Sequence, residues 1–436
     1  MARKMVRSSL GVALASVMAF NAQAATQIEW WHAMGGTLGE KINEIAAGFN
    51  ASQDDYEVKP VFKGNYTETM TAAVAAFRAK QQPHIVQVFE VGTASMMAAE
   101  GAVYPTWKLM EDAGEAFDPD NYLSAITGYY TSDDGKMLSM PFNSSTPVLY
   151  YNADALEKAG AEPPKTWEDM GQVGQKLLDA GYKCGFTTGW QSWVQLENFS
   201  ARQDIPFASN NNGFSGLDTV LEFNSDKHVQ HIAQLADWQK SGIFGYGGRR
   251  SDSLPKFYSG ECAMYMGSSA SYSGVKSSVQ DFEFGVAQLP YWQSMIDSPK
   301  NTIIGGATLW TLQGHDSEDY KGVAQFFTYL SSPEVQADWH QFTGYLPITH
   351  AAAELTREQG FYAANPGTDV AITQMTSGEP TANSKGLRLG NFVQIRDVIN
   401  EELEKVWAGD ASAKDALDEA VERGNDLLRK FERANR

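Results

Sequence analysis

Cysteine, long apolar runs and positive charge are all scarce in this sequence. The two cysteines, Cys184 and Cys262, are too few for a scaffold of several disulfides or for a zinc site. They can pair with each other or remain as buried free thiols. After residue 24, no stretch approaches the roughly 20 consecutive apolar residues of a membrane-spanning helix, so we expect a soluble mature chain.

The shortage of positive charge excludes one class of partner. The chain has 34 basic and 53 acidic residues and a formal net charge of -19. A protein that binds nucleic acid needs a basic surface, so we expect no nucleic-acid partner. Any anionic ligand must be held by local donors, because the field of the whole protein opposes it.

The common catalytic and cofactor motifs are also missing. The sequence contains no H-E-x-x-H, no G-x-S-x-G, no P-loop and no G-x-G-x-x-G. His228 and His231 lie three residues apart in a predicted helix, a spacing that can place two metal ligands on one face. No third ligand is near them in the sequence, so we interpret them as part of a surface helix. We predict no metal and no cofactor.

The first 24 residues have the features of a cleaved secretory signal. A segment with three basic residues precedes the apolar residues 10–20, and residues 22–24 form an A-x-A cleavage site. We therefore expect Ala25 to be the first mature residue, with a net charge of -22 on the remaining chain. The expected location is the periplasm of a Gram-negative cell or the outside of the cell. Because that compartment is oxidising, we predict a Cys184–Cys262 disulfide.

The first third of the mature chain alternates between strand and helix patterns. Such a β-α-β-α-β order predicts a doubly wound α/β lobe, in which ligands bind beyond the carboxyl ends of the strands. Tyr66 and Glu90 occupy positions of that kind. We expect Thr37 and Glu40 to form a capping box at the start of the first helix. Strands are predicted at residues 27–32, 58–62 and 84–89, and helices at about 37–49 and 67–77.

Residues 141–152 combine two patterns that suggest a binding site. Small polar residues at 143–146 are followed by the apolar run 148–151. The apolar run is typical of a strand buried on both faces. The amide and the hydroxyl groups before it suit a small polar ligand in a cleft, although a plain loop fits as well.

The alternation resumes after residue 160 and predicts a second α/β lobe. Thr166 is a predicted helix cap. Gly305 and Gly306 interrupt a predicted strand, which indicates that something approaches the backbone closely there. No low-complexity linker separates the lobes, so we expect the chain to cross between them several times. The predicted strands are 183–187, 262–266, 284–289 and 302–310, and the helices are 228–240, 323–330, 333–343, 393–408 and 411–433.

Several blocks of the sequence together resemble a known family. The blocks at residues 150–160, 164–167 and 257–264 are similar to the extracellular solute-binding proteins of ABC importers, of the maltose-binding type. The resemblance covers essentially the whole mature chain and is strongest to the branch that binds glycerol 3-phosphate. Seven further blocks carry that narrower match: 64–66, 89–94, 141–152, 189–191 with 196–200, 303–307, 343–349 and 385–391.

This resemblance implies a type II periplasmic-binding-protein fold. In that fold two doubly wound α/β lobes are joined by three crossovers and close around a ligand in the cleft between them. The implied crossovers fall near Ser145, Gln288 and Tyr345. The implied division is a signal peptide at 1–24, an N-terminal lobe of 25–142 plus 289–345, and a C-terminal lobe of 146–288 plus 346–436.

The resemblance also implies a set of ligand contacts. A phosphate monoester needs several directed donors, such as a guanidinium group, hydroxyl groups and a backbone N–H. Arg396 is the expected phosphate partner, although a salt bridge to Glu401 or Asp397 is a structural alternative. Glu90 is an acceptor and is therefore expected at the glycerol hydroxyls. The implied ligand-binding residues are Tyr66, Glu90, Ser145, Trp190, Trp193, Ser268, Gly306, Tyr345 and Arg396.

The function that the resemblance implies is capture, without catalysis, of glycerol 3-phosphate for an ABC transporter permease. Glycerophosphodiesters such as glycerophosphocholine are expected ligands as well, and the receptor is expected to be a monomer. The first alternative is a sugar- or oligosaccharide-binding protein of the same fold, which would need aromatic platforms and carboxylates in place of Arg396 and two serines. The second alternative is a secreted phosphodiesterase, which would need a metal site.

Overall fold

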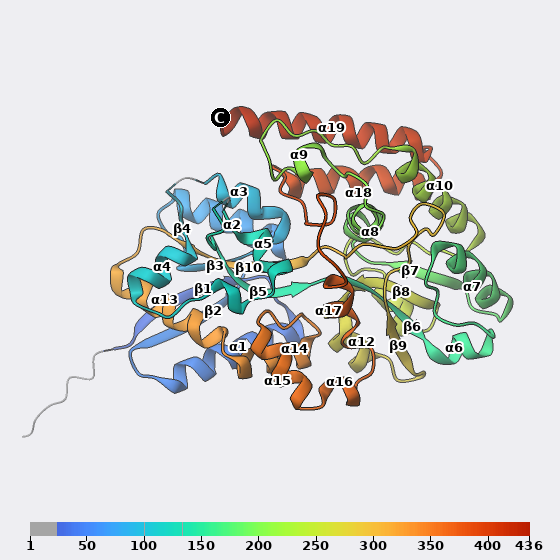
Figure 1. The fold of residues 1–436 in the computed structure, drawn as a ribbon. Coiled ribbons are helices and arrows are strands. Elements are labelled where there is room, and N and C mark those ends of the chain that lie inside the picture. The colour runs from blue at the N-terminus through green and yellow to red at the C-terminus, as the bar shows by residue number, and fades with distance from the viewer. Residues whose placement is uncertain (1–23, 100, 133) are drawn as a thin grey trace, which may run out of the picture.

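Two α/β halves lie side by side in the computed structural model, which describes residues 24–99, 101–132 and 134–436 (Figure 1). The predicted signal peptide therefore lies outside the described residues, except for Ala24. Among the described residues, no helix combines the length and the apolar character needed to cross a membrane.

The first half is built on a six-stranded mixed sheet. Its strands run in the order β2-β1-β3-β10-β4, and β5 also pairs with β10. The pairs β1–β2 and β1–β3 are parallel, whereas β10 is antiparallel to its neighbours. The strands are β1 (Thr26–His32), β2 (Tyr56–Phe62), β3 (Ile85–Phe89), β4 (Val103–Tyr104), β5 (Met140–Ser145) and β10 (Gly305–Leu312).

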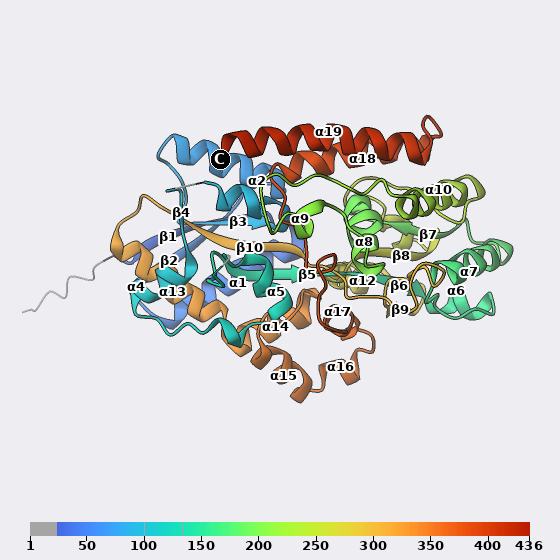
Figure 2. The ribbon, with the colours of Figure 1, turned by 45° about the horizontal axis from the view of Figure 1, so that its top comes forward.

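Helices cover both faces of this first sheet (Figures 1 and 2). They are α1 (Gly36–Ser52), α2 (Tyr66–Arg78), η1 (Glu90–Gly92), α3 (Thr93–Met97), α4 (Thr106–Ala113), η2 (Pro119–Asn121), α5 (Ser124–Tyr130), α13 (Ser317–Leu330) and α14 (Pro333–Thr343). The expected capping box at Thr37 is wrong. Helix α1 begins one residue earlier, after Gly35, and no side chain caps it. The box occurs instead at α2, where Asn65 and Glu68 cap each other.

The second half is built on a four-stranded sheet in the order β7-β8-β6-β9. Its strands are β6 (Pro147–Asn152), β7 (Cys184–Thr188), β8 (Cys262–Ser268) and β9 (Phe284–Ala287). The predicted central strand is confirmed as β6, which pairs with β8 on one edge and β9 on the other. It begins two residues after β5 ends, so the chain passes from one sheet to the other at Thr146.

The remaining helices of the described residues accompany the second sheet and the connection between the halves. Helix α19 lies along α18, and its carboxyl end reaches over the first half (Figures 1 and 2). Thr166 caps α7 as predicted. Two helices, α15 (His350–Glu358) and α16 (Phe361–Ala364), lie between the halves beside α14. The others are α6 (Ala153–Lys158), α7 (Trp167–Asp179), η3 (Trp193–Glu197), α8 (Asn198–Arg202), α9 (Ser209–Asn212), α10 (Asp226–Ser241), α11 (Leu254–Tyr258), η4 (Ser269–Ser271), α12 (Tyr272–Ser278), α17 (Val370–Met375), α18 (Phe392–Ala408) and α19 (Ala413–Ala434).

Three passages of the chain between the sheets are hydrogen-bonded to one another. Thr146 Oγ1 donates to Thr302 Oγ1 at 2.6 Å and lies 3.1 Å from the Ile303 carbonyl oxygen. The Leu346 N–H donates to the Ser144 carbonyl oxygen at 2.8 Å. The three connections therefore form one hinge region.

We propose that the second connection lies further along the chain than the resemblance implies. Trp292 packs against Trp167 and donates to His231 Nδ1 at 3.1 Å, so residues near 292 still belong with the second half. We therefore place this crossover at 302–304 and propose the other lobe boundaries as given above. The Leu123 N–H donates to the Ile348 carbonyl oxygen, so the residues just after Tyr345 also contact the first half.

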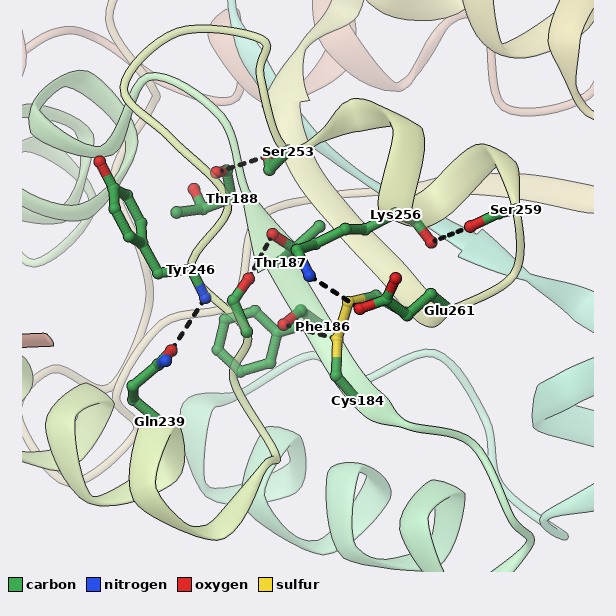
Figure 3. The surroundings of a disulfide bond; sticks show 12 residues. Cys184, Phe186, Thr187, Thr188, Gln239, Tyr246, Ser253, Lys256, Ser259 and Glu261 are labelled. Atoms are coloured by element: carbon green, nitrogen blue, oxygen red, sulfur yellow. Dashed lines mark hydrogen bonds and ion pairs between the residues drawn. A yellow bond between two sulfur atoms is a disulfide. The ribbon is translucent and has the colours of Figure 1, made fainter. Parts of the chain in front are cut away.

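The predicted disulfide between Cys184 and Cys262 is confirmed (Figure 3). The two cysteines are the first residues of the adjacent parallel strands β7 and β8, they are paired in register, and their Cα atoms are 4.6 Å apart. Both are buried, and a Cβ atom added at Gly245 would lie 3.1 Å from Cys184 Sγ. The bond therefore ties together the start of two core strands beneath a closely packed loop.

Breaking this disulfide is expected to lower the free energy of unfolding by about 4 kcal/mol, because the closed loop is long and constrains the unfolded chain. Urea unfolding with and without a reductant measures the effect. A Cys184→Ala/Cys262→Ala variant should show no response to the reductant. An unchanged midpoint for the reduced wild-type protein would contradict this prediction.

Candidate functional site

A pocket of about 340 Å³ lies between the two sheets, beside the hinge region. It is bordered by the carboxyl ends of β3, β5 and β8, by the first turns of α1 and α2, and by the start of β10. All nine residues expected to bind a ligand line it: Tyr66, Glu90, Ser145, Trp190, Trp193, Ser268, Gly306, Tyr345 and Arg396. Sequence reasoning missed other lining residues, among them Thr37, Ser251, Tyr258, Ser271 and Ser273.

Gly305 and Gly306 are required by protein packing at the edge of the pocket. Gly306 has a φ of +90°, and a Cβ atom there would lie 1.9 Å from the Asn143 carbonyl oxygen on β5. A Cβ atom at Gly305 would lie 2.5 Å from the Trp193 ring. The predicted close approach to the strand backbone is therefore present, and the approaching groups are β5 and a tryptophan of the protein itself.

Tyr66 and Tyr345 offer neutral hydroxyl groups to the pocket. Asn143 Nδ2 donates to the Tyr66 hydroxyl at 2.9 Å, and the Tyr66 ring stacks on Phe89. Burial, followed by the neighbouring Tyr345, raises the pKa of Tyr66 well above its usual value. Burial also raises the pKa of Tyr345. Both phenols therefore keep their protons and can donate hydrogen bonds to an anionic ligand.

Two tryptophans form the wall contributed by the second half. Trp190 follows β7 with a φ of +48°, and its Nε1–H donates to Ser251 Oγ at 3.3 Å. Trp193 is buried, and its Nε1–H donates to the Ile304 carbonyl oxygen at 3.3 Å in the hinge region. The two rings are held by different elements, so the wall is fixed with respect to both the second half and the hinge.

Arg396 is the one cationic side chain among the described residues that line the pocket. Its Nε and Nη2 atoms donate to Glu197 Oε1 and Oε2 at 2.7 and 2.6 Å. Nη2 also forms an ion pair with Glu90 Oε1 at 2.7 Å. The alternative partners considered from the sequence, Glu401 and Asp397, are wrong; their place is taken by two distant carboxylates.

The three charged groups are buried together, and this burial affects the ionisation of Arg396 and Glu90. Burial alone would lower the pKa of Arg396, but the Glu197 and Glu90 carboxylates raise it, so the guanidinium stays charged. Burial raises the pKa of the Glu90 carboxyl group, and Arg396 only partly offsets this effect. Glu197 was missed in the sequence because it is 199 residues away from Arg396. No spacing rule links them.

His228 and His231 are buried in the second half, so their assignment to a surface helix is wrong. His228 bonds to Ser225 Oγ and Ser200 Oγ at 2.7 and 2.9 Å. Because its ring nitrogens are used in this way, His228 offers no lone pair to a metal. His231 is in the same situation, because its ring nitrogens face Trp292 Nε1 and Gln195 Oε1.

Another cluster among the described residues, His84, His315 and Asp319, has three potential metal-ligand atoms within 4.8 Å of one another. The Glu29 N–H donates to His84 Nδ1 at 3.0 Å, so the neutral ring carries its proton on Nε2. That protonated nitrogen is the atom that faces Asp319 Oδ2, 3.6 Å away. We therefore assign no metal to this cluster.

Comparison with known proteins gives the class to which this fold and pocket belong. The model of the bacterial extracellular solute-binding protein family matches residues 44–369. The chain belongs to this family, and it has the type II periplasmic-binding fold of two α/β lobes.

Individual proteins with assigned ligands also match this chain. The sn-glycerol-3-phosphate-binding periplasmic protein UgpB of Escherichia coli strain K12 is 51% identical over 432 residues, which cover 98% of this chain and 97% of the relative. The protein of the same name from Salmonella typhimurium strain LT2 is 51% identical over 433 residues, covering 98% of each chain.

Among solved structures, UgpB of Mycobacterium tuberculosis in complex with glycerophosphocholine has a TM-score of 0.79 and 20% identity, covering 93% of this chain and 99% of that one. Maltose-bound MalE3 of T. maritima has a TM-score of 0.77 and 18% identity, covering 92% and 100%. At such identities the solved structures establish the fold alone.

Proposed function

We propose that this chain is a periplasmic receptor that captures sn-glycerol 3-phosphate, and glycerophosphodiesters such as glycerophosphocholine, and delivers them to the permease of an ABC importer. The observation that carries the proposal is the pocket itself. It combines one guanidinium group, several hydroxyl groups and a glycine-rich strand start at the junction of the two lobes. The similarity to UgpB over nearly the whole chain supports the same ligand class.

The pocket suits a small phosphate ester better than a sugar. Ser145, Ser268 and the two neutral tyrosines supply hydrogen-bond donors for phosphate oxygens. No hydrogen bond from Arg396 Nη1 to any of the described residues is present, so its two N–H groups are available as well. These local donors can hold an anion although the net charge of the protein is strongly negative.

The acceptor groups indicate where the glycerol part lies. The Glu90 carboxylate would repel phosphate but accepts hydrogen bonds from glycerol hydroxyls. Trp190 and Trp193 supply apolar surface for the carbon chain. We place the glycerol end between these three residues, and the phosphate against the serines, the tyrosines and Arg396 Nη1. This assignment includes eight of the nine residues of the site; the ninth is Gly306.

Calorimetric titration of the purified mature protein tests the proposal. We expect measurable binding of glycerol 3-phosphate and of glycerophosphocholine, and no binding of maltose under the same conditions. Binding of maltose alone would favour the sugar-binding alternative. Incubation with glycerophosphocholine should release no choline, because we propose a receptor without catalysis; release would point to a phosphodiesterase.

Tryptophan fluorescence gives an independent prediction for the glycerol end. Ligand binding should change the emission, because Trp190 lines the pocket and is only partly buried. Trp190→Phe should remove most of that change while leaving binding measurable by calorimetry. The chain has 11 tryptophans, so Trp107→Phe is a suitable control outside the pocket lining. An unaltered signal in Trp190→Phe would place the ligand elsewhere.

A further inference from the structure

The guanidinium group of Arg396 has a limited number of donors, and most of them are already engaged. The edge formed by Nε and Nη2 is held by both oxygens of Glu197. The Nη2 atom also contacts Glu90, which belongs to the other half of the molecule. A phosphate group therefore cannot form a two-point contact with the Nε–Nη2 edge, and the Nη1 corner remains for it.

We propose that Glu197, which does not line the pocket, is a positioning residue for ligand binding: it holds Arg396 by its Nε–Nη2 edge so that Nη1 faces the ligand. This inference rests on the proposed function and adds a residue to it. Glu197 is fixed in the second half, and its side chain is 1% exposed. Its carboxylate therefore acts on the ligand only through Arg396.

The alternative geometry shows what Glu197 prevents. Glu90 now contacts one nitrogen of Arg396 from across the pocket. Without Glu197, the guanidinium group can turn and give Glu90 a two-point ion pair, the preferred geometry for arginine and carboxylate. That pair would occupy the donors that the phosphate needs and would have to be broken when ligand binds.

The local backbone supports this positioning role. Glu197 is the last residue of η3, a single π-helical turn that starts at Trp193. The Asn198 N–H bonds to the Trp193 carbonyl oxygen, five residues back, and Asn198 Oδ1 accepts from the Ile303 N–H at 2.9 Å. π-turns of this kind are rare and are frequently found at functional sites. The turn fixes Trp193 in the pocket wall and Glu197 on Arg396 at the same time, and it is anchored to the hinge region.

Titration of Glu197→Gln with glycerol 3-phosphate and glycerophosphocholine tests the proposal. The glutamine side chain has nearly the same size but only one acceptor oxygen, so it cannot accept from both Nε and Nη2 of Arg396. We therefore expect both ligands to bind roughly 10- to 100-fold more weakly. Glu197→Asp keeps the charge but not the reach, and we expect it to recover only part of the affinity. Glu402→Gln is the matched control: Glu402 is also buried and paired with cations, Lys405 and Arg423, but it does not line the pocket.

A double-mutant cycle separates positioning from a structural role. In an Arg396→Met background, Glu197→Gln should have no further effect on affinity, because its target is gone. In the wild-type protein, the Arg396 Nε–H signal in a ¹⁵N NMR spectrum should report a carboxylate-bound proton, and Glu197→Gln should shift it. These readouts stay interpretable if either variant is less stable.

Some outcomes would overturn the proposal. Binding by Glu197→Gln within about threefold of wild type, or tighter than wild type, would show that the guanidinium group needs no such support. Additive effects in the double-mutant cycle would show that Glu197 does not act through Arg396. If wild-type protein binds neither ligand, the proposed function and this inference both fail. If wild type binds and Glu197→Gln is unaffected, only this inference fails.

Discussion

Arg396→Ala is expected to weaken binding of glycerol 3-phosphate by roughly 30-fold to several thousand-fold. Removing one partner of a buried, hydrogen-bonded charge pair costs about 2–5 kcal/mol, and each 1.4 kcal/mol is about tenfold in affinity. No other cation among the described pocket residues can replace it. The affinity for phosphate esters should therefore fall far more than that for plain glycerol.

The same substitution is also expected to lower the free energy of unfolding. Its side chain is buried between Glu197 and Glu90, and its loss removes the cation that both buried carboxylates contact. Breaking such a group typically costs about 3–5 kcal/mol. Uptake of a proton by Glu90, whose pKa burial already raises, reduces that cost.

Calorimetry and urea unfolding of the same preparations measure both effects. Arg423→Ala is the matched control, because Arg423 pairs with Glu401 and Glu402 outside the pocket. Arg396→Lys should remain weak in binding, since one ammonium group cannot serve Glu197, Glu90 and a ligand together. If Arg396→Ala binds within about threefold of wild type, the phosphate does not contact this residue.

Acidification from pH 7 to pH 5 is expected to lower the free energy of unfolding by about 4 kcal/mol through His228 and His231 alone. Burial lowers the pKa of each of these histidines to about 3. The folded state therefore keeps both rings neutral, whereas the unfolded chain takes up protons below about pH 6.5. Their contribution is fully present above that pH and is lost as the pH falls toward 3.

The hydrogen bonds of His231 explain why protonation is resisted. Its Nδ1 accepts from Trp292 Nε1–H, and its Nε2 lies 3.3 Å from Gln195 Oε1. A second ring proton would remove the acceptor for Trp292 inside an aromatic core. Burial lowers the pKa of His32 and of His340 to about 4 as well, and these two rings add to the loss in the same direction.

Urea unfolding at pH 7, 6 and 5 measures this dependence. His231→Gln keeps a polar side chain at that position and should reduce the slope of stability against pH by about one proton. Some stability will be lost at pH 7, but the difference from wild type should shrink as the pH falls. A difference that stays constant from pH 7 to pH 5 would contradict the assignment to His231.

Local sequence patterns predicted the elements well and their surroundings less well. The strands around residues 27–32 and 148–151 and the cap at Thr166 were correct because neighbouring residues determine them. The cap at Thr37 was wrong, because two glycines before it allow α1 to begin earlier. His228 and His231 were placed on the surface, since their spacing in the helix does not reveal that aromatic residues from other elements cover them.

The sequence by itself determined the two α/β lobes and, through resemblance, nine of the residues that line the pocket, and it predicts a cleavage signal. These features depend on neighbouring residues or on blocks that can be matched to a family. Only the tertiary structure decided that Glu197 and Glu90 share Arg396, because the three charges come from η3, η1 and α18. A buried charge must find partners wherever the fold brings them, and sequence distance places no limit on that choice.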